Sequence, residues 1–156
     1  AFNSINSINE YTPSGSLVRQ VTTGITKTWK AVEVSNNVWA VIPESSSATN
    51  PMITMYTNGT RINSFGSYGP ESYPRDLLID SRGYFLVVQY DLNEIHVVNP
   101  SLTDHRVIQF PVNVQMNGPF AMNYDESRGR LYIGEFSVTR RLMVFNNVTN
   151  LDFLFN

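Results

Sequence analysis

The sequence predicts an all-β protein, and three observations support this. No long stretch places apolar residues at helical spacing without also containing β-branched runs and turn dipeptides. Short runs rich in Val, Ile, Tyr and Phe occur along the chain between Asn, Gly and Pro turn signals. Segments of this kind also recur at a regular interval.

The expected strands are short, and residues that favour turns separate them. Asn58-Gly59 and Asp80–Gly83 are typical turn sequences, because Asn and Gly accept the positive φ that tight turns require. The clearest expected strands are Val32–Val34, Val38–Ile42, Met52–Tyr56, Leu77–Asp80, Tyr84–Val88 and Glu94–Val98.

An internal repeat narrows the class to a β-propeller. Tyr73–Val87 aligns with Gly118–Ile133 if one residue is inserted at the turn. Equivalent positions in four further segments are 45, 42 and 47 residues apart, which is the length of a four-stranded propeller blade. A β-sandwich of unrelated amphipathic strands is the alternative. The four equivalent positions are Tyr11, Tyr56, Val98 and Phe145.

One repeat illustrates the expected blade. Leu77–Ile79 is the innermost strand, and Asp80–Gly83 turns the chain into a second strand, Tyr84–Val88. Glu94–Val98 is the third strand, and Arg106–Phe110 is the more polar outer strand.

The chain is too short for a closed propeller, which has four to eight blades. It supplies about three blades, counted as a lone outer strand Leu17–Val21 followed by groups of four, four and three strands. We therefore expect 1–156 to be a single half-ring domain, with 1–11 and 149–156 as terminal extensions or swapped strands. Dimerisation would complete a six-bladed ring. The alternative is that the chain is part of a longer propeller.

These segments resemble NHL-repeat β-propellers, in particular the carboxy-terminal half of the propellers of tripartite-motif-like proteins of marine invertebrates. The resemblance covers most of residues 8–148 and implies a propeller used for recognition. Some relatives bind RNA through a basic surface, but Gln89 and Glu94 stand where the family commonly has Asp and a basic residue. The segments that carry the resemblance are Glu10–Gln20, Tyr73–Gly83, Asn99–Leu102 and Asp125–Gly134.

Composition excludes several kinds of site. The chain has no Cys and two His, so it can form no disulfide, thiolate zinc site or cysteine nucleophile. Its 11 basic and 13 acidic residues give no overall attraction for nucleic acid, and RNA binding would depend on a local group of arginines. We expect no enzymatic activity, cofactor, metal or membrane insertion. The arginines concerned are Arg128, Arg130, Arg140 and Arg141.

The expected function is ligand recognition by loops on a rigid scaffold. Aromatic rings can stack on sugar rings, and amide and carboxylate groups can bind hydroxyls, so the ligand is a glycan or a protein. The expected ligand-binding residues are Tyr68, Tyr73, Tyr90, Asp91, Asn93, Glu135 and Phe136, whereas Trp29 and Trp39 are expected to pack within their own blade.

Three alternative functions remain: a structural protein that forms oligomers through its edges, an RNA-binding domain, and a calcium-dependent hydrolase. The hydrolase would use carboxylates among Asp80, Asp91, Glu94, Asp125 and Glu135, although Asp80 and Asp125 stand at turns where hydrogen bonding to the backbone is usual.

Two sequons, at Asn58 and Asn147, could accept N-glycans. Together with the abundance of Asn, Ser and Thr, they favour an extracellular protein over a cytoplasmic one.

Overall fold

The structure, a computed structural model, describes residues 7–23, 25, 27–44, 51–66, 72–110, 113–138 and 140–148. Over these residues the chain forms antiparallel β-strands, which confirms the predicted all-β class. The helical structure within the described ranges is one turn of 3₁₀-helix, η1 (Glu126–Arg128). No described helix has the length and apolar character needed to cross a membrane.

The described strands form four sheets, in each of which neighbouring strands are consecutive in the chain. The first sheet contains β1 (Ser7–Tyr11) and β2 (Leu17–Thr22). The second contains β3 (Thr28–Ser35), β4 (Val38–Pro43), β5 (Ile53–Thr57) and β6 (Thr60–Phe65). The third contains β7 (Pro74–Ile79), β8 (Phe85–Gln89), β9 (Glu94–Val98) and β10 (His105–Val107). The fourth contains β11 (Pro119–Asp125), β12 (Arg130–Glu135) and β13 (Leu142–Phe145).

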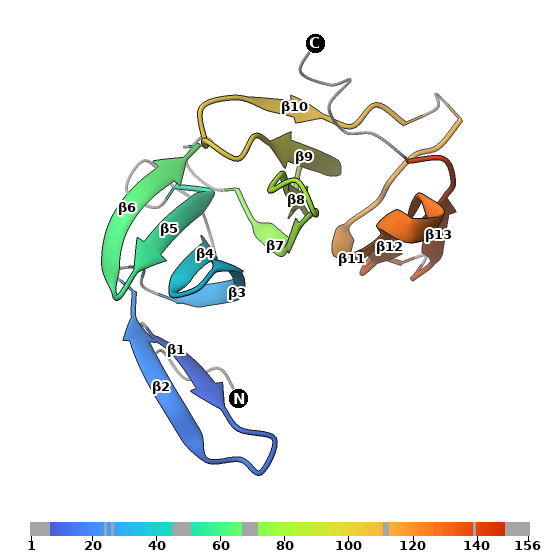
Figure 1. Cartoon of the computed structure of the whole chain (residues 1–156). Helices are drawn as coiled ribbons and strands as arrows, with labels where there is room; N and C mark the ends of the chain where they lie inside the picture. Colours follow the sequence, from blue (N-terminus) through green and yellow to red (C-terminus); the bar gives the residue numbers. More distant parts are fainter. Residues whose placement is uncertain are drawn as a thin grey trace.

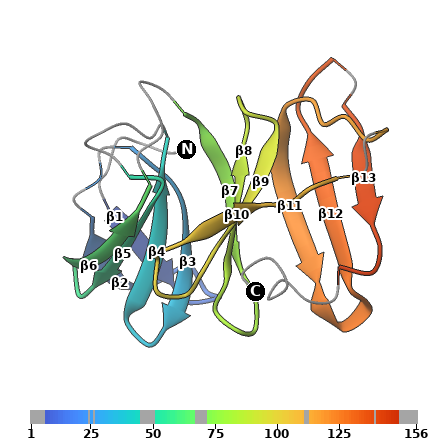
Figure 2. The ribbon, with the colours of Figure 1, turned by 90° about the horizontal axis from the view of Figure 1, so that it is seen from above.

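The sheets follow one another along an arc. Figure 1 shows β3, β7 and β11 on the inner side of this arc and β6, β10 and β13 on the outer side. β7 lies between β3 and β11 and contacts both. In the view turned by 90°, the second, third and fourth sheets stand side by side (Figure 2). The first strands of three sheets are therefore brought close together.

The core lies between consecutive sheets because side chains alternate along each strand. Phe85 and Val87 of β8 pack against the second sheet, whereas Leu86 and Val88 pack against the fourth. The third sheet is thus covered on both faces, which explains why β8 is continuously apolar rather than alternating.

The amino-terminal part differs from the expected lone outer strand. Residues 7–11 form β1, which pairs with β2 from Ser7↔Thr22 to Tyr11↔Leu17, so the first sheet has two strands rather than one. Gly15 adopts a φ of 86° in the connecting turn, a conformation that glycine accepts without steric cost. Residues 1–6 and 149–156 lie outside the described residues.

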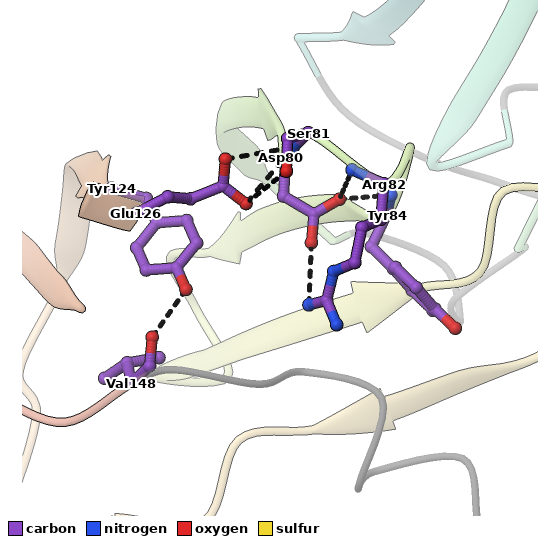
Figure 3. Close-up of polar contacts among 7 residues, drawn as sticks. All are labelled: Asp80, Ser81, Arg82, Tyr84, Tyr124, Glu126 and Val148. Atoms are coloured by element: carbon purple, nitrogen blue, oxygen red, sulfur yellow. Dashed lines mark hydrogen bonds and ion pairs between the residues drawn. The ribbon is translucent and has the colours of Figure 1, made fainter. Parts of the chain in front are cut away.

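Aspartates organise the turns after β7 and β11, as expected from the sequence. Asp80 Oδ1 accepts hydrogen bonds from the N–H groups of Arg82 and Tyr84 at 3.0 and 2.8 Å, and its Oδ2 pairs with the Arg82 guanidinium. Asp125 likewise accepts from Arg128 N–H at 3.2 Å and pairs with the Arg128 guanidinium. Figure 3 shows the Asp80 turn.

One side chain joins two of these turns. The carboxylate of Glu126, in η1, accepts a hydrogen bond at 3.1 Å from the backbone N–H of Ser81, which follows β7 (Figure 3). This contact ties the fourth sheet to the third at the edge where β7 and β11 finish. We call this edge of the sheets the Asp80 end.

Asp76 joins three sheets near the opposite end of β7. Its Oδ1 pairs with Lys30 Nζ on β3, and its Oδ2 accepts a hydrogen bond at 2.6 Å from the N–H of Met122 on β11. The Asp76 side chain is 9% exposed, and that of Lys30 is 36% exposed. Because first strands have no strand neighbour on their inner edges, Asp76 satisfies a backbone donor that would otherwise lack a partner.

We predict that Asp76→Asn lowers the free energy of unfolding by about 2 kcal/mol, because it removes the charge that faces Lys30 and weakens the acceptor for Met122. Urea unfolding followed by circular dichroism measures the loss. The matched control is Asp104→Asn, which breaks the Arg106 pair with side chains 45% and 46% exposed and should cost less. Equal losses in the two variants would contradict the bridging role of Asp76.

Candidate functional site

The first strands of three sheets carry irregularities at equivalent positions. The β3–β4 register shifts across Trp29, the β7–β8 register across Arg75, and the β11–β12 register across Phe120. These residues are 46 and 45 positions apart, in step with the repeat. A bulge changes the direction of its side chain. All three lie at the end where β7 and β11 begin, which we call the Arg75 end.

The Arg75 guanidinium lies among four aromatic rings. Its central carbon is 4.6 Å from the ring centroid of Trp29, 5.3 Å from Tyr73, 5.8 Å from Tyr90 and 6.0 Å from Phe120. Trp29 Nε1 also donates a hydrogen bond of 2.7 Å to the Arg75 carbonyl oxygen. The second, third and fourth sheets therefore meet around this one cation.

Phe136, which follows β12, forms the exposed rim of this group. Its ring centroid lies 5.3 Å from that of Phe120, and 60% of the residue is exposed. Tyr90 OH donates to the Phe136 carbonyl oxygen at 3.4 Å. The other members are half-buried. We call Arg75 and the rings of Trp29, Tyr73, Tyr90, Phe120 and Phe136 the aromatic cluster.

Arg75 is not neutralised by the part of the chain that the structure describes. Its Nε is buried without a hydrogen-bond partner there, and no described carboxylate lies within ion-pair distance of its guanidinium. The neighbouring carboxylate, Asp76, binds Lys30 and Met122 instead. A buried donor without a partner costs about 1–3 kcal/mol, so the guanidinium is held at this position at some cost to stability.

Two of the predicted ligand-binding residues hold the surrounding loops together. Asp91 Oδ1 accepts a hydrogen bond of 3.0 Å from Tyr73 N–H, and Asn93 Oδ1 accepts one of 2.7 Å from Gly118 N–H. Both residues are exposed. Each uses one side-chain atom in these bonds, and Asp91 Oδ2 and Asn93 Nδ2 have no hydrogen-bond partner among the described residues.

Glu135 lies deeper and supports the loop that carries Phe136. Its side chain is fully enclosed, with Oε1 accepting from Asn117 N–H at 2.7 Å and Oε2 from Arg141 Nε at 2.6 Å. The hydrogen bond to Glu135 raises the pKa of Arg141 above its ordinary value. The described contacts of Glu135 are therefore with the protein's own loops.

The structure thus brings three predicted ligand-binding residues, Tyr73, Tyr90 and Phe136, into one cluster. Tyr68 lies outside the described residues. The sequence interpretation missed the contributions of Trp29, Arg75 and Phe120 to this cluster. A signal for two of them was present, because the repeat alignment places Arg75 opposite Phe120. Trp29 contacts residues of the third and fourth sheets, not only its own sheet.

The four arginines considered for RNA binding are divided between two ends of the fourth sheet. Arg128 and Arg130 lie at the start of β12, and Arg140 and Arg141 precede β13, whose Leu142 pairs with Gly134 near the end of β12. Arg128 pairs with Asp125 at 2.9 Å, and Arg141 pairs with Glu135. Their positive charges are thus separated and partly balanced.

The carboxylates considered for calcium also have protein partners. Asp80 and Asp125 bind their own turns, and Glu94 Oε2 lies 2.8 Å from His96 Nε2. Burial lowers the pKa of His96 below its ordinary value, against the opposing effect of Glu94. Within the described ranges, no three His, Asp or Glu residues come together as metal ligands.

A cavity of about 670 Å³ lies between the first and second sheets, away from the aromatic cluster. Most of its lining residues have polar side chains, and they include Arg19, which already pairs with Glu10 and with Glu33, the latter at 3.0 Å. Asn58 is exposed at its edge, in the β5–β6 turn, whereas Thr149 of the Asn147 sequon lies outside the described residues. We favour the aromatic cluster as the site because its cation has no ion-pair partner among the described residues.

We predict that Gly118→Ala destabilises the protein more than Gly15→Ala. Both glycines have positive φ, 63° and 86°, so both variants carry a backbone cost. A Cβ at Gly118 would also lie 3.0 Å from Tyr90 Cε2 and 3.3 Å from the Phe136 carbonyl oxygen, whereas a Cβ at Gly15 has no atom within 4 Å. Urea unfolding should show an excess loss of about 1 kcal/mol. Equal losses would mean that the loops do not confine Tyr90.

Comparison with known proteins shows the fold and no more. No family model matches the chain, and no curated protein matches it. One similar solved structure is a crystal structure of a protein of unknown function from Bacteroides caccae, with a TM-score of 0.68 and 17% sequence identity. The match covers 90% of this chain and 56% of that chain, so this chain spans little more than half of the protein that it resembles in fold.

Proposed function

We propose that the four sheets are blades of a partial β-propeller of the NHL type. Three observations support this proposal. The sheets follow an arc with their first strands on the inner side, equivalent bulges recur at the repeat interval, and a turn with an Asp–Arg pair closes both β7–β8 and β11–β12. A propeller scaffold would display the loops at the Arg75 end on one rigid face.

On this scaffold, the aromatic cluster is a recognition site without catalytic function, and its ligand is a glycan. The observation that supports this most directly is the meeting of three sheets in a half-buried group of rings with an exposed rim at Phe136. Aromatic faces stack on the C–H faces of sugar rings. Asp91 and Asn93 lie beside the rings and carry atoms that can bind sugar hydroxyls.

A glycan array followed by titration calorimetry tests this function. Phe136→Ala should weaken binding of a glycan identified on the array about tenfold, because it removes an exposed stacking surface. The fold should be preserved, since the side chain lies at the rim. The control is Ile62→Ala on β6, the outer strand of the second sheet, where the residue is 49% exposed. It should leave the affinity unchanged.

Two outcomes would contradict the proposed site. If a glycan binds and both variants retain wild-type affinity, the glycan binds elsewhere. If no glycan on the array binds, the glycan-binding function is wrong, and a protein ligand becomes the better explanation for the exposed rings.

A second candidate function, assembly with another copy of the chain, is favoured by the exposed face of the fourth sheet. Leu142 and Val144 of β13 are 66% and 46% exposed. Ala121 and Gly134 pair in register beside Leu142 and extend this surface. Both faces of the third sheet are packed against neighbours, whereas this face of the fourth sheet is exposed, so a second copy closing the ring would cover it.

Light scattering at micromolar concentration tests the assembly. We expect the wild-type mass to be that of a dimer and Leu142→Asp to reduce it to that of a monomer, because a charge would be buried in the contact. Val138→Asp is the control, since Val138 is fully exposed in a loop after β12. A monomeric wild-type protein would exclude this function.

A further inference from the structure

We propose that Arg75 binds a carboxylate of the glycan, so that the ligand is an acidic sugar such as a uronic acid. This inference rests on the glycan-binding function proposed for the aromatic cluster and specifies the class of glycan.

The geometry of Arg75 supports the assignment. Its contacts with Trp29, Tyr73, Tyr90 and Phe120 are to ring centroids at 4.6–6.0 Å. Rings attract a cation but accept no conventional hydrogen bond, so these contacts leave the N–H donors of the guanidinium unused. The buried Nε illustrates this, since it has no partner among the described residues. A planar carboxylate matches two parallel guanidinium donors.

Two other cations of the sheets that form the cluster have partners within the protein. Lys30 is paired with Asp76, and Arg141 is paired with Glu135 at 2.6 Å. Arg75 therefore differs from both in having no described carboxylate within ion-pair distance. A single cation that has no described ion-pair partner fits a ligand with a localised negative charge better than a polyanion, which needs several phosphate contacts.

The aromatic surroundings strengthen the expected interaction. Arg75 is half-buried and its Nε is buried, so an ion pair there is screened less than one at the surface. Asp91 lies at the same rim, where its exposed carboxylate would repel a second ligand charge and accept a hydrogen bond from a hydroxyl. This pairing of one cation and one anion suits a sugar that carries one carboxylate and several hydroxyls.

Titration calorimetry with two probes tests the inference: the methyl glycoside of galacturonic acid, which carries one carboxylate, and its methyl ester, which has the same ring and no charge. We expect the wild-type protein to bind the acid at least about tenfold more tightly than the ester. Arg75→Gln should bind the two with equal affinity, because the donors that favour the acid are removed. The matched control, Arg130→Gln, replaces an exposed arginine at the opposite end of β12 and should keep the preference for the acid.

A second variant keeps the test decisive if Arg75→Gln does not fold. Arg75→Lys retains a cation among the rings but lacks the two parallel donors, so its preference for the acid should be smaller than in the wild-type protein. Raising the salt concentration from about 0.05 to about 0.5 M should also reduce the wild-type preference.

The outcomes separate the two proposals. If the wild-type protein binds acid and ester equally, the role of Arg75 is wrong and the glycan-binding function stands. The role of Arg75 is also wrong if Arg75→Gln or Arg75→Lys keeps the full preference. If neither probe binds but another glycan on the array does, galacturonate is excluded as the ligand. If that other glycan is neutral, the proposal of an acidic sugar is wrong. If no glycan binds, both proposals fail.

Discussion

The buried carboxylate of Asp76 is the interaction on which the arrangement of the sheets depends. First strands on the inner side of the arc have backbone groups with no strand neighbour, and these groups must find partners elsewhere. Asp76 accepts from Met122 N–H on β11 and pairs with Lys30 on β3, so one side chain of β7 connects the second, third and fourth sheets. The apolar clusters between sheets bring the faces together, but they are not directional. The hydrogen bonds of Asp76 add a fixed register between first strands.

The two ends of the sheets use their polar groups differently. At the Asp80 end, Asp80 and Asp125 bind their own turns, and Glu126 joins neighbouring turns through Ser81. At the Arg75 end, an arginine donor lacks a described partner, and a large aromatic ring is exposed at Phe136. Unsatisfied donors and exposed rings reduce stability, and their presence at the Arg75 end supports the binding face proposed there.

The sequence allowed prediction of the strands and their grouping, but less of the site. Groups of four, four and three strands were predictable because β8 and β9 are apolar runs between clear turn signals, and because Asp-containing turns recur. The pairing of β1 with β2 was not predicted, since Ser7, Asn9 and Gln20 give the hairpin a polar face that resembles a loop. Tyr73, Tyr90 and Phe136 were recognised as aromatic loop residues. Their assembly around Arg75 depends on contacts between residues about 45 positions apart, which local patterns do not contain.

Stability and recognition meet in two adjacent residues. Along β7 successive side chains point to opposite faces, and the irregular register at Arg75 turns its side chain toward the rings while Asp76 remains buried between strands. Asp76 therefore holds the backbone on which Arg75 is mounted, and Trp29 Nε1 holds the Arg75 carbonyl oxygen from the second sheet. Because both anchors come from other sheets, the guanidinium keeps its position only when all three sheets are assembled. A ligand that binds Arg75 and the rings would contact groups from each of these sheets at once, so its binding energy would add to the contacts that hold the sheets together.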